Sequence, residues 1–379
     1  MAKTKFNINR DLFKETSHSP ALVDIVGEDM VDQIIDFCFI ANPYYPTEEM
    51  LDDLLAKFSA MIKAYPSSNP GLARQNLADV LQTNADFLVL GNGATELINI
   101  IEKQLIDDLA IPIPTFSEYI EKLKNTGSAK LFQLDPKLNY QLDLKEYADW
   151  INDNQINSAL IINPGNPTGQ LMQLDELKWF LKEMSHLKMI ILDESFIDFA
   201  DEQIPSLIPE ITAFDNLIIV RSMSKHCGVP GLRLGYCCAS NQTFLKKIKD
   251  YLPIWNINSM AEYFLLQLKR TNDIYHETRL RVIREVRDLE HQLQQIPGYK
   301  VYPTGSNFIL LKIEFGMTAT ELQFSLLENK GLYVRDCSNK AGLDNYHIRV
   351  SSQGREKDLY LVDGLRELAT TNPVSHFHK

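Results

Sequence analysis

Short apolar runs separated by helix-like segments fill residues 85–240, and this alternation limits the folds open to the chain more than any other feature. Three of the runs read as buried, β-branched strands, and they span residues 159–162, 189–192 and 217–220. Strands that alternate with helices predict a mostly parallel sheet with helices on both faces. Asn166, Asp193 and Lys225 each follow one of these runs. Because ligands lie at the carboxyl ends of the strands in such sheets, we expect these three side chains to converge on one site.

The third strand leads into a segment rich in small residues, Arg221-Ser-Met-Ser-Lys-His-Cys-Gly-Val-Pro-Gly-Leu-Arg-Leu-Gly-Tyr236. Its glycines and proline suit a loop pressed against a ligand, and they follow Lys225 directly. A lysine can form a Schiff base with an aldehyde, which is easier where charge or burial lowers its pKa. Ser222, Ser224 and Arg233 would supply hydroxyl donors and a planar cation for a phosphate. Aldehyde and phosphate together indicate pyridoxal phosphate, and an ordinary loop with an exposed lysine is the alternative.

This segment resembles the cofactor-lysine motif of the fold-type I aminotransferases, Ser-x-Ser-Lys followed by Gly-x-Arg-x-Gly. The resemblance extends over roughly residues 35–365, with the other family segments in the expected order. It implies an aspartate aminotransferase-like α/β fold, with pyridoxal 5′-phosphate held as a Schiff base by Lys225. It also implies a large cofactor-binding domain over residues 37–265 and a smaller α+β domain made of residues 1–36 and 266–379.

Three further residues match family positions that contact the pyridine ring. By resemblance, Asp193 faces the ring nitrogen and keeps it protonated, so that the ring can accept electrons from the substrate's Cα. An acid directly after four apolar strand residues also needs a cation or a donor, which agrees with that role. Asn166, in the run Asn163-Pro-Gly-Asn-Pro-Thr-Gly169, would donate its amide to the phenolic oxygen O3′. Phe116, in a Pro-Thr-Phe segment, would stack on the ring, with a plain core phenylalanine as the alternative.

The segment Gly91-Asn-Gly-Ala-Thr95 follows an apolar run and is typical of a strand, a glycine turn and the start of a helix. Gly93 allows the tight turn, so that the backbone amides of Ala94 and Thr95 would begin the helix. Helix N-termini bind phosphate through free N–H groups and the helix dipole. Many strand-to-helix turns share this pattern, and it gains weight because the lysine segment already requires a phosphate.

Tyr65-Pro66 ends a helix that we predict over residues 47–64, with Thr47 as its N-cap. One interpretation of Tyr65 is an exposed tyrosine in a turn. In the family that the chain resembles, a tyrosine at this step reaches the cofactor phosphate of the other subunit. We therefore expect a homodimer whose active sites are shared between the two chains.

Substrate-binding residues are expected at both ends of the chain. Arg335 and Arg349 lie in a strand-helix-strand pattern over about residues 300–379. Surface ion pairs are one interpretation of the two arginines, whereas by resemblance they grip the anionic groups of an amino-acid substrate. His18, in a Ser-His-Ser-Pro segment, and Asn42, which ends an apolar run expected to be a strand, are the other substrate-binding residues implied.

The third residue after Asp193 helps to choose the reaction. In the aminotransferases it is a tyrosine that bonds O3′, and here it is Phe196, as in the threonine-phosphate decarboxylases of cobalamin side-chain synthesis. The segments 251–258 and 339–344 also resemble those decarboxylases. Their His-Gly-Gly-Asn is replaced here by His18-Ser-Pro-Ala, which leaves threonine phosphate and serine phosphate both open as substrates. We expect a phosphoamino-acid decarboxylase, and a histidinol-phosphate aminotransferase is the alternative.

Composition excludes several other classes of protein. With 45% hydrophobic and 23% charged residues the chain is typical of a globular protein, and its net charge of -12 argues against nucleic-acid binding. No apolar run is long enough for a membrane span, and no secretory signal is evident. The five cysteines lack metal-ligand spacing, so we expect no metal and a cytoplasmic location. Residues 255–293 are predicted to be helical, with their arginines on a solvated face.

Overall fold

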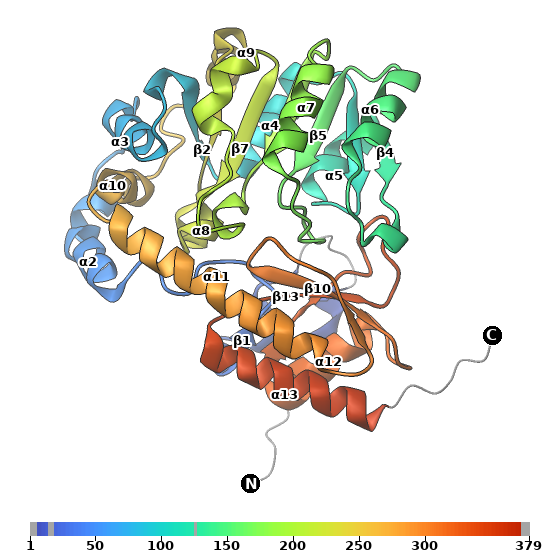
Figure 1. Ribbon diagram of the computed structural model, residues 1–379. Coiled ribbons are helices and arrows are strands. Elements are labelled where there is room, and N and C mark those ends of the chain that lie inside the picture. The colour runs from blue at the N-terminus through green and yellow to red at the C-terminus, as the bar shows by residue number, and fades with distance from the viewer. Residues whose placement is uncertain (1–5, 14–18, 125–126, 373–379) are drawn as a thin grey trace.

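A seven-stranded sheet in the order β2-β8-β7-β6-β5-β3-β4 lies at the centre of the fold (Figure 1). The computed structural model describes residues 6–13, 19–124 and 127–372. The strands are β2 (Leu88–Asn92), β3 (Leu109–Ile113), β4 (Ala129–Gln133), β5 (Ser158–Ile162), β6 (Met189–Asp193), β7 (Leu217–Ser222) and β8 (Leu234–Cys238). Neighbours from β7 to β4 are parallel, and β8 is antiparallel to β2 and β7. The mostly parallel sheet predicted from the alternation of runs is confirmed.

Helices cover both faces of this sheet, which explains why β3, β5 and β6 are apolar over nearly their whole length. In β5, Ala159 and Ile161 pack into one hydrophobic cluster, whereas Leu160 and Ile162 pack into the cluster on the opposite face. Successive side chains alternate in this way because a strand has a period of two. One cluster includes residues of α3 (Gly71–Leu81), α6 (Leu144–Asp153) and α7 (Leu174–Glu183), and the other includes residues of α4 (Ala94–Leu105), α5 (Glu118–Lys124) and α9 (Gln242–Tyr251).

A separate antiparallel sheet, in the order β12-β13-β10-β9, lies below the first in Figure 1. Its strands are β9 (Tyr299–Val301), β10 (Phe308–Ile313), β12 (Arg335–Asp336) and β13 (His347–Ser351), and β1 (Ile35–Asp36) pairs in parallel with β11 (Leu332–Tyr333) beside it. Two helices, α12 (Ala319–Lys330) and α13 (Arg355–Thr371), complete its hydrophobic core. Thr318 begins α12 with a capping box, in which its hydroxyl accepts from the Glu321 N–H.

The long helix α11 (Asn272–Gln294) runs along both sheet regions, from α10 (Ser259–Gln267) toward α12 (Figure 1). Its Arg279 donates to the backbone oxygens of Asp198 and Asp201, which belong to the larger sheet region. The same helix packs against β9 and α13 of the smaller region. The two-domain division at residues 265 and 266 stays a prediction, and α11 contacts both regions.

Several expected elements differ in detail from the structure. The apolar run from residue 36 forms only the two-residue strand β1, and the helical stretch 255–293 is two helices, α10 and α11. Helix α2 (Glu48–Lys63) is confirmed, but the N-cap Thr47 makes no side-chain hydrogen bond to it. Two short helices, α1 (Leu22–Val26) and α8 (Met223–His226), complete the described α-helices. None of the helices within the described ranges is long and apolar enough to cross a membrane.

Candidate active site

A cavity at the carboxyl ends of β5, β6 and β7 brings the three strand-end residues together, as predicted. Most of the other expected site residues also line it. The expected residues that line the cavity are Ala94, Thr95, Phe116, Asn166, Asp193, Phe196, Ser222, Ser224, Lys225, Arg233, Arg335 and Arg349. The first ten of these residues lie on the larger sheet or on the helices and loops that follow its strands. The last two, both arginines, lie on strands of the smaller sheet. The cavity therefore lies where the two sheet regions meet.

Lys225 stands on α8, a single helical turn that begins directly after β7. Burial of the ammonium and, next, repulsion from Arg349 and Arg233 lower the pKa of Lys225 to about 8, although the Asp193 carboxylate opposes that shift. A larger fraction of the amine is thus neutral near neutral pH than in an exposed lysine. A neutral amine is the form that attacks an aldehyde.

Asp193 ends β6 and is only 5% exposed. Its carboxylate accepts from the Ser195 N–H and from the Tyr119 hydroxyl, both at 2.9 Å, so its orientation is fixed. Burial nevertheless raises the pKa of Asp193, which means that the carboxylate lacks a full counter-charge. A cationic ring nitrogen would supply that charge.

Asn166 belongs to a tight turn after β5, in which the Gly165 N–H donates to the Gln170 backbone oxygen. The Arg349 guanidinium donates to its side-chain oxygen at 2.7 Å. Because that oxygen is engaged, the amide NH₂ is the end of Asn166 that remains to donate within the cavity. This agrees with the predicted contact to a phenolic oxygen.

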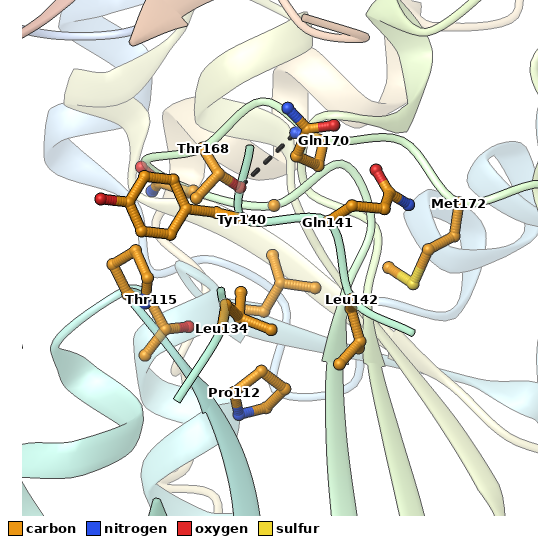
Figure 2. A pocket seen from close by; sticks show the side chains of 13 residues that line it. Pro112, Thr115, Leu134, Tyr140, Gln141, Leu142, Thr168, Gln170 and Met172 are labelled. Carbon is orange, nitrogen blue, oxygen red and sulfur yellow. Dashed lines mark hydrogen bonds between the residues drawn. The ribbon is translucent and has the colours of Figure 1, made fainter. Parts of the chain in front are cut away.

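Figure 2 shows a second, smaller pocket beside this turn, with Thr168 and Gln170 on one side and Leu134, Leu142 and Met172 among the other side chains. The dashed line there joins the Gln170 N–H to the Thr168 hydroxyl. No residue that lines this pocket is charged. It offers neither a nucleophilic amine nor cations for a phosphate, so the chemistry belongs to the cavity around Lys225.

The turn from β2 into α4 contains the predicted phosphate-binding residues. Gly93 is the N-cap of α4 with a φ of 77°, and a Cβ placed on it would lie 2.5 Å from Arg233 Nη2. The Arg233 guanidinium therefore lies close to the residue that begins α4, in space that a side chain at position 93 would partly fill. The Ser224 hydroxyl is buried without a hydrogen-bond partner in the described structure. An unpartnered donor, a helix N-terminus and an arginine together fit a phosphate group.

Arg335 and Arg349 are direct cross-strand partners on β12 and β13. Both are nearly buried, with exposed fractions of 8% and 9%. Arg349 also donates to the backbone oxygen of Cys38 at 2.7 Å, and Arg335 donates to the Asn339 side chain at 2.9 Å. The two guanidinium groups are thus held in place rather than free on the surface, which contradicts the interpretation as surface ion pairs.

Two aromatic residues face the same cavity. Phe196 packs edge-on against Phe308 of β10, with 5.0 Å between ring centroids. Phe116 packs edge-on against Tyr119, with 6.3 Å between ring centroids, and is only partly buried. The partial burial of Phe116 agrees better with the expected stacking on a flat cofactor than with a position in the closed core.

Some expected site residues lie elsewhere. Asn42 is buried, but its amide donates to the His226 backbone oxygen and to the Thr278 hydroxyl, so a direct substrate contact is not supported. Tyr65 is 81% exposed and stacks on Trp255, outside the cavity of its own chain. His18 lies outside the described residues.

Sequence reasoning missed two residues of the site, Tyr119 and Lys340. The Tyr119 hydroxyl bonds Asp193, and Lys340 lines the cavity with the two arginines. The sequence marks Lys340 only through the segment 339–344, which resembles the decarboxylases. It gives no local signal for Tyr119, whose partner lies far along the chain.

Comparison with known proteins gives consistent matches over nearly the whole chain. The profile of the family described as "Aminotransferase class I and II" matches residues 35–362. The chain is 34% identical over 366 residues to an L-serine phosphate decarboxylase of Campylobacter jejuni, with 90% of each protein covered. The solved structure of a decarboxylase from Sulfurospirillum multivorans is 30% identical, with a TM-score of 0.85 over 93% of this chain and 92% of that one. A histidinol-phosphate aminotransferase from Clostridium acetobutylicum is 28% identical, with a TM-score of 0.82 over 89% of this chain and 100% of that one.

Proposed function

Because this chain belongs to the class I and II aminotransferase family, we propose that it decarboxylates a small phosphorylated amino acid. Serine phosphate, which would give ethanolamine phosphate, is the first candidate, and threonine phosphate is the second. The observation that carries the proposal is the presence of Arg335 and Arg349 in the same buried cavity as Lys225. Two guanidinium groups suit a substrate with both a carboxylate and a phosphate. The 34% identity to an L-serine phosphate decarboxylase supports the choice of substrate.

The cofactor is pyridoxal 5′-phosphate. When bound, it supplies an electron sink for the pair released as a bond at the substrate's Cα breaks. Lys225 would hold its aldehyde, Asp193 would pair with the ring nitrogen, and Asn166 would donate to the phenolic oxygen. Phe116 would lie against the ring. The remaining residues would bind the phosphate: Gly93, Ala94, Thr95, Ser222, Ser224 and Arg233.

The protein's own groups would decide which bond breaks. Arg335 and Arg349 would orient the substrate by its charged ends, so that the bond from Cα to the carboxylate, and not the Cα–H bond, is the one placed to break. Such orientation is mainly a positioning effect. The substrate amine would first replace Lys225 Nζ on the aldehyde, which frees the lysine amine to deliver a proton to Cα after carbon dioxide leaves.

Phe196 supports decarboxylation over transamination. It places a hydrocarbon edge where the aminotransferases that the chain resembles carry a tyrosine hydroxyl, so Asn166 would be the neutral donor to the phenolic oxygen. The ring is 4% exposed and packs on Phe308.

We further propose a cytoplasmic homodimer with shared sites. Leu51, Leu55, Phe58 and Ile62 recur at helical spacing on α2 and are 42–65% exposed. An uncovered apolar face of this kind favours contact with a second copy of the chain. Tyr65 follows directly and would reach the cofactor phosphate of the partner. The five free cysteines, all buried, agree with a reducing compartment.

Product analysis by mass spectrometry tests the reaction. The holoenzyme is given serine phosphate, threonine phosphate, or histidinol phosphate with 2-oxoglutarate. Carbon dioxide and a phosphorylated amine, formed from a phosphoamino acid without any keto acid, are the expected products. Glutamate formed only from histidinol phosphate and 2-oxoglutarate would establish the aminotransferase instead.

A further inference from the structure

Lys340 is a buried cation of the cavity that the proposed chemistry does not yet use. It lies in the loop between β12 and β13 and is only 8% exposed. Its Nζ donates to the Ser117 hydroxyl at 2.5 Å, and no carboxylate pairs with it among the described residues. Burying an ammonium that is paired only with a neutral hydroxyl is costly. An anionic group of the substrate would offset the cost of burying this ammonium.

Lys340 lies among other cationic side chains of the cavity. Burial lowers the pKa of Lys340 to about 8, and among its charged neighbours Arg335 has the largest effect. For Lys225 the corresponding neighbour is Arg349. Arg335 and Arg349 are cross-strand partners, Lys340 follows Arg335 in the loop after β12, and all three line the same cavity as Lys225.

We propose that Lys340 binds the phosphate group of the amino-acid substrate and makes the site selective for a doubly charged anion. The inference rests on the proposed function, because it takes the substrate to be a phosphoamino acid. Such a substrate carries one charge on its carboxylate and close to two on its phosphate. Arg335, Arg349 and Lys340 provide three matching cations among the residues that line the cavity.

Lys340 has one other interpretation that the experiment must separate. By holding Ser117, it could position Phe116, the next residue, without touching the substrate. Ser117→Ala removes that hydrogen bond and leaves the ammonium in place. It is therefore the matched control for Lys340→Gln, which removes the charge. Lys357→Gln, on the exposed side of α13, controls for loss of positive charge in general.

Calorimetric titration of the holoenzyme with ethanolamine phosphate measures anion binding without turnover. Loss of a charged hydrogen bond predicts an affinity about 10- to 100-fold lower in Lys340→Gln. Ser117→Ala and Lys357→Gln should stay within about 3-fold of the parent protein, and Lys340→Arg should restore most of the affinity. Equal losses in Ser117→Ala and Lys340→Gln, or no loss in either, would overturn the proposal. Lys340→Met provides a second neutral variant if Lys340→Gln does not fold.

Selectivity is tested by comparing serine phosphate with serine O-sulfate, whose side chain carries a single charge. The ratio of kcat/KM values should fall about 10-fold or more in Lys340→Gln, because the second charge loses its partner. An unchanged ratio would mean that Lys340 does not distinguish a doubly charged side chain from a singly charged one. If neither phosphoamino acid is decarboxylated, the proposed function fails, yet the calorimetric comparison still decides whether Lys340 binds phosphate.

Discussion

Arg349 donates to the side-chain oxygen of Asn166 over 2.7 Å, and so joins the smaller sheet to the turn beside Lys225. The two residues lie 183 positions apart in the chain. One guanidinium thus fixes the amide that would contact the cofactor while it remains in reach of the substrate. Substrate binding and cofactor orientation depend on the same side chain.

Arg349→Ala should raise the KM for the phosphoamino acid about 10- to 100-fold, because it removes a charged partner of the substrate. Arg349→Lys should recover little of the lost substrate affinity, since an ammonium lacks the planar geometry with which the guanidinium donates to both Asn166 and the Cys38 carbonyl. Steady-state kinetics of the two variants provides the measurement. A KM equal to that of the parent protein would remove Arg349 from the substrate site.

Asp193→Ala should leave a folded protein with at most about a hundredth of the parent activity, because the ring nitrogen loses its partner. Tyr119→Phe removes only a neutral hydrogen bond to the same carboxylate, and we expect a loss of less than about 10-fold. Circular dichroism verifies folding while turnover is measured. Near-normal turnover in Asp193→Ala would refute the assignment of this carboxylate.

Phe196→Tyr should increase transamination relative to decarboxylation, because it returns a hydroxyl donor to the phenolic oxygen. The measurement is the amount of keto acid formed per carbon dioxide released, with Phe116→Tyr as a control for an added hydroxyl elsewhere in the cavity. If the product ratio does not change, Phe196 does not discriminate between the two reactions.

Tyr65 can be tested with mixed dimers. Tyr65→Ala and Lys225→Ala homodimers should both be nearly inactive. Co-refolding them should restore activity, because one site of each hybrid dimer receives Lys225 from one chain and Tyr65 from the other. Activity that stays at the level of the separate variants would show that Tyr65 does not act across the dimer interface.

Glu102 on α4 predicts a pH-dependent stability. It is 2% exposed, both its carboxyl oxygens lack partners in the described structure, and burial raises its pKa to about 8. The unfolded chain releases this proton near pH 4.3, whereas the folded chain keeps it until about pH 8. Folding therefore becomes less favourable as pH rises through that window, by on the order of 2–4 kcal/mol.

The substitution Glu102→Gln removes this titration. It should raise the melting temperature at pH 8 and leave it nearly unchanged at pH 4.5, as thermal denaturation at the two values would measure. Glu277→Gln, an exposed position on α11, should change neither value. A stabilisation of equal size at both pH values would contradict a buried protonated acid at position 102.

The sequence predicts the large sheet well because strands buried on both faces appear as continuous apolar runs. The convergence of Asn166, Asp193 and Lys225 follows from the same pattern. It does not predict the pairing of Tyr119 with Asp193 or of Lys340 with Ser117, since those partners are 74 and 223 positions apart. Arg279 was expected on a solvated helix face and is 2% exposed, because carbonyl groups that only the tertiary fold presents accept its N–H donors.

The cavity gathers five cationic side chains, Lys225, Arg233, Arg335, Lys340 and Arg349, against two carboxylates, Asp193 and Glu118. Like charges held together in this way repel one another and destabilise the folded protein when the cavity is empty. Favourable interactions elsewhere in the fold must compensate for that cost. The site thus trades stability for function. Neutral substitutions such as Lys340→Met should make the empty chain harder to unfold and the enzyme poorer, and anionic ligands should be among its strongest stabilisers.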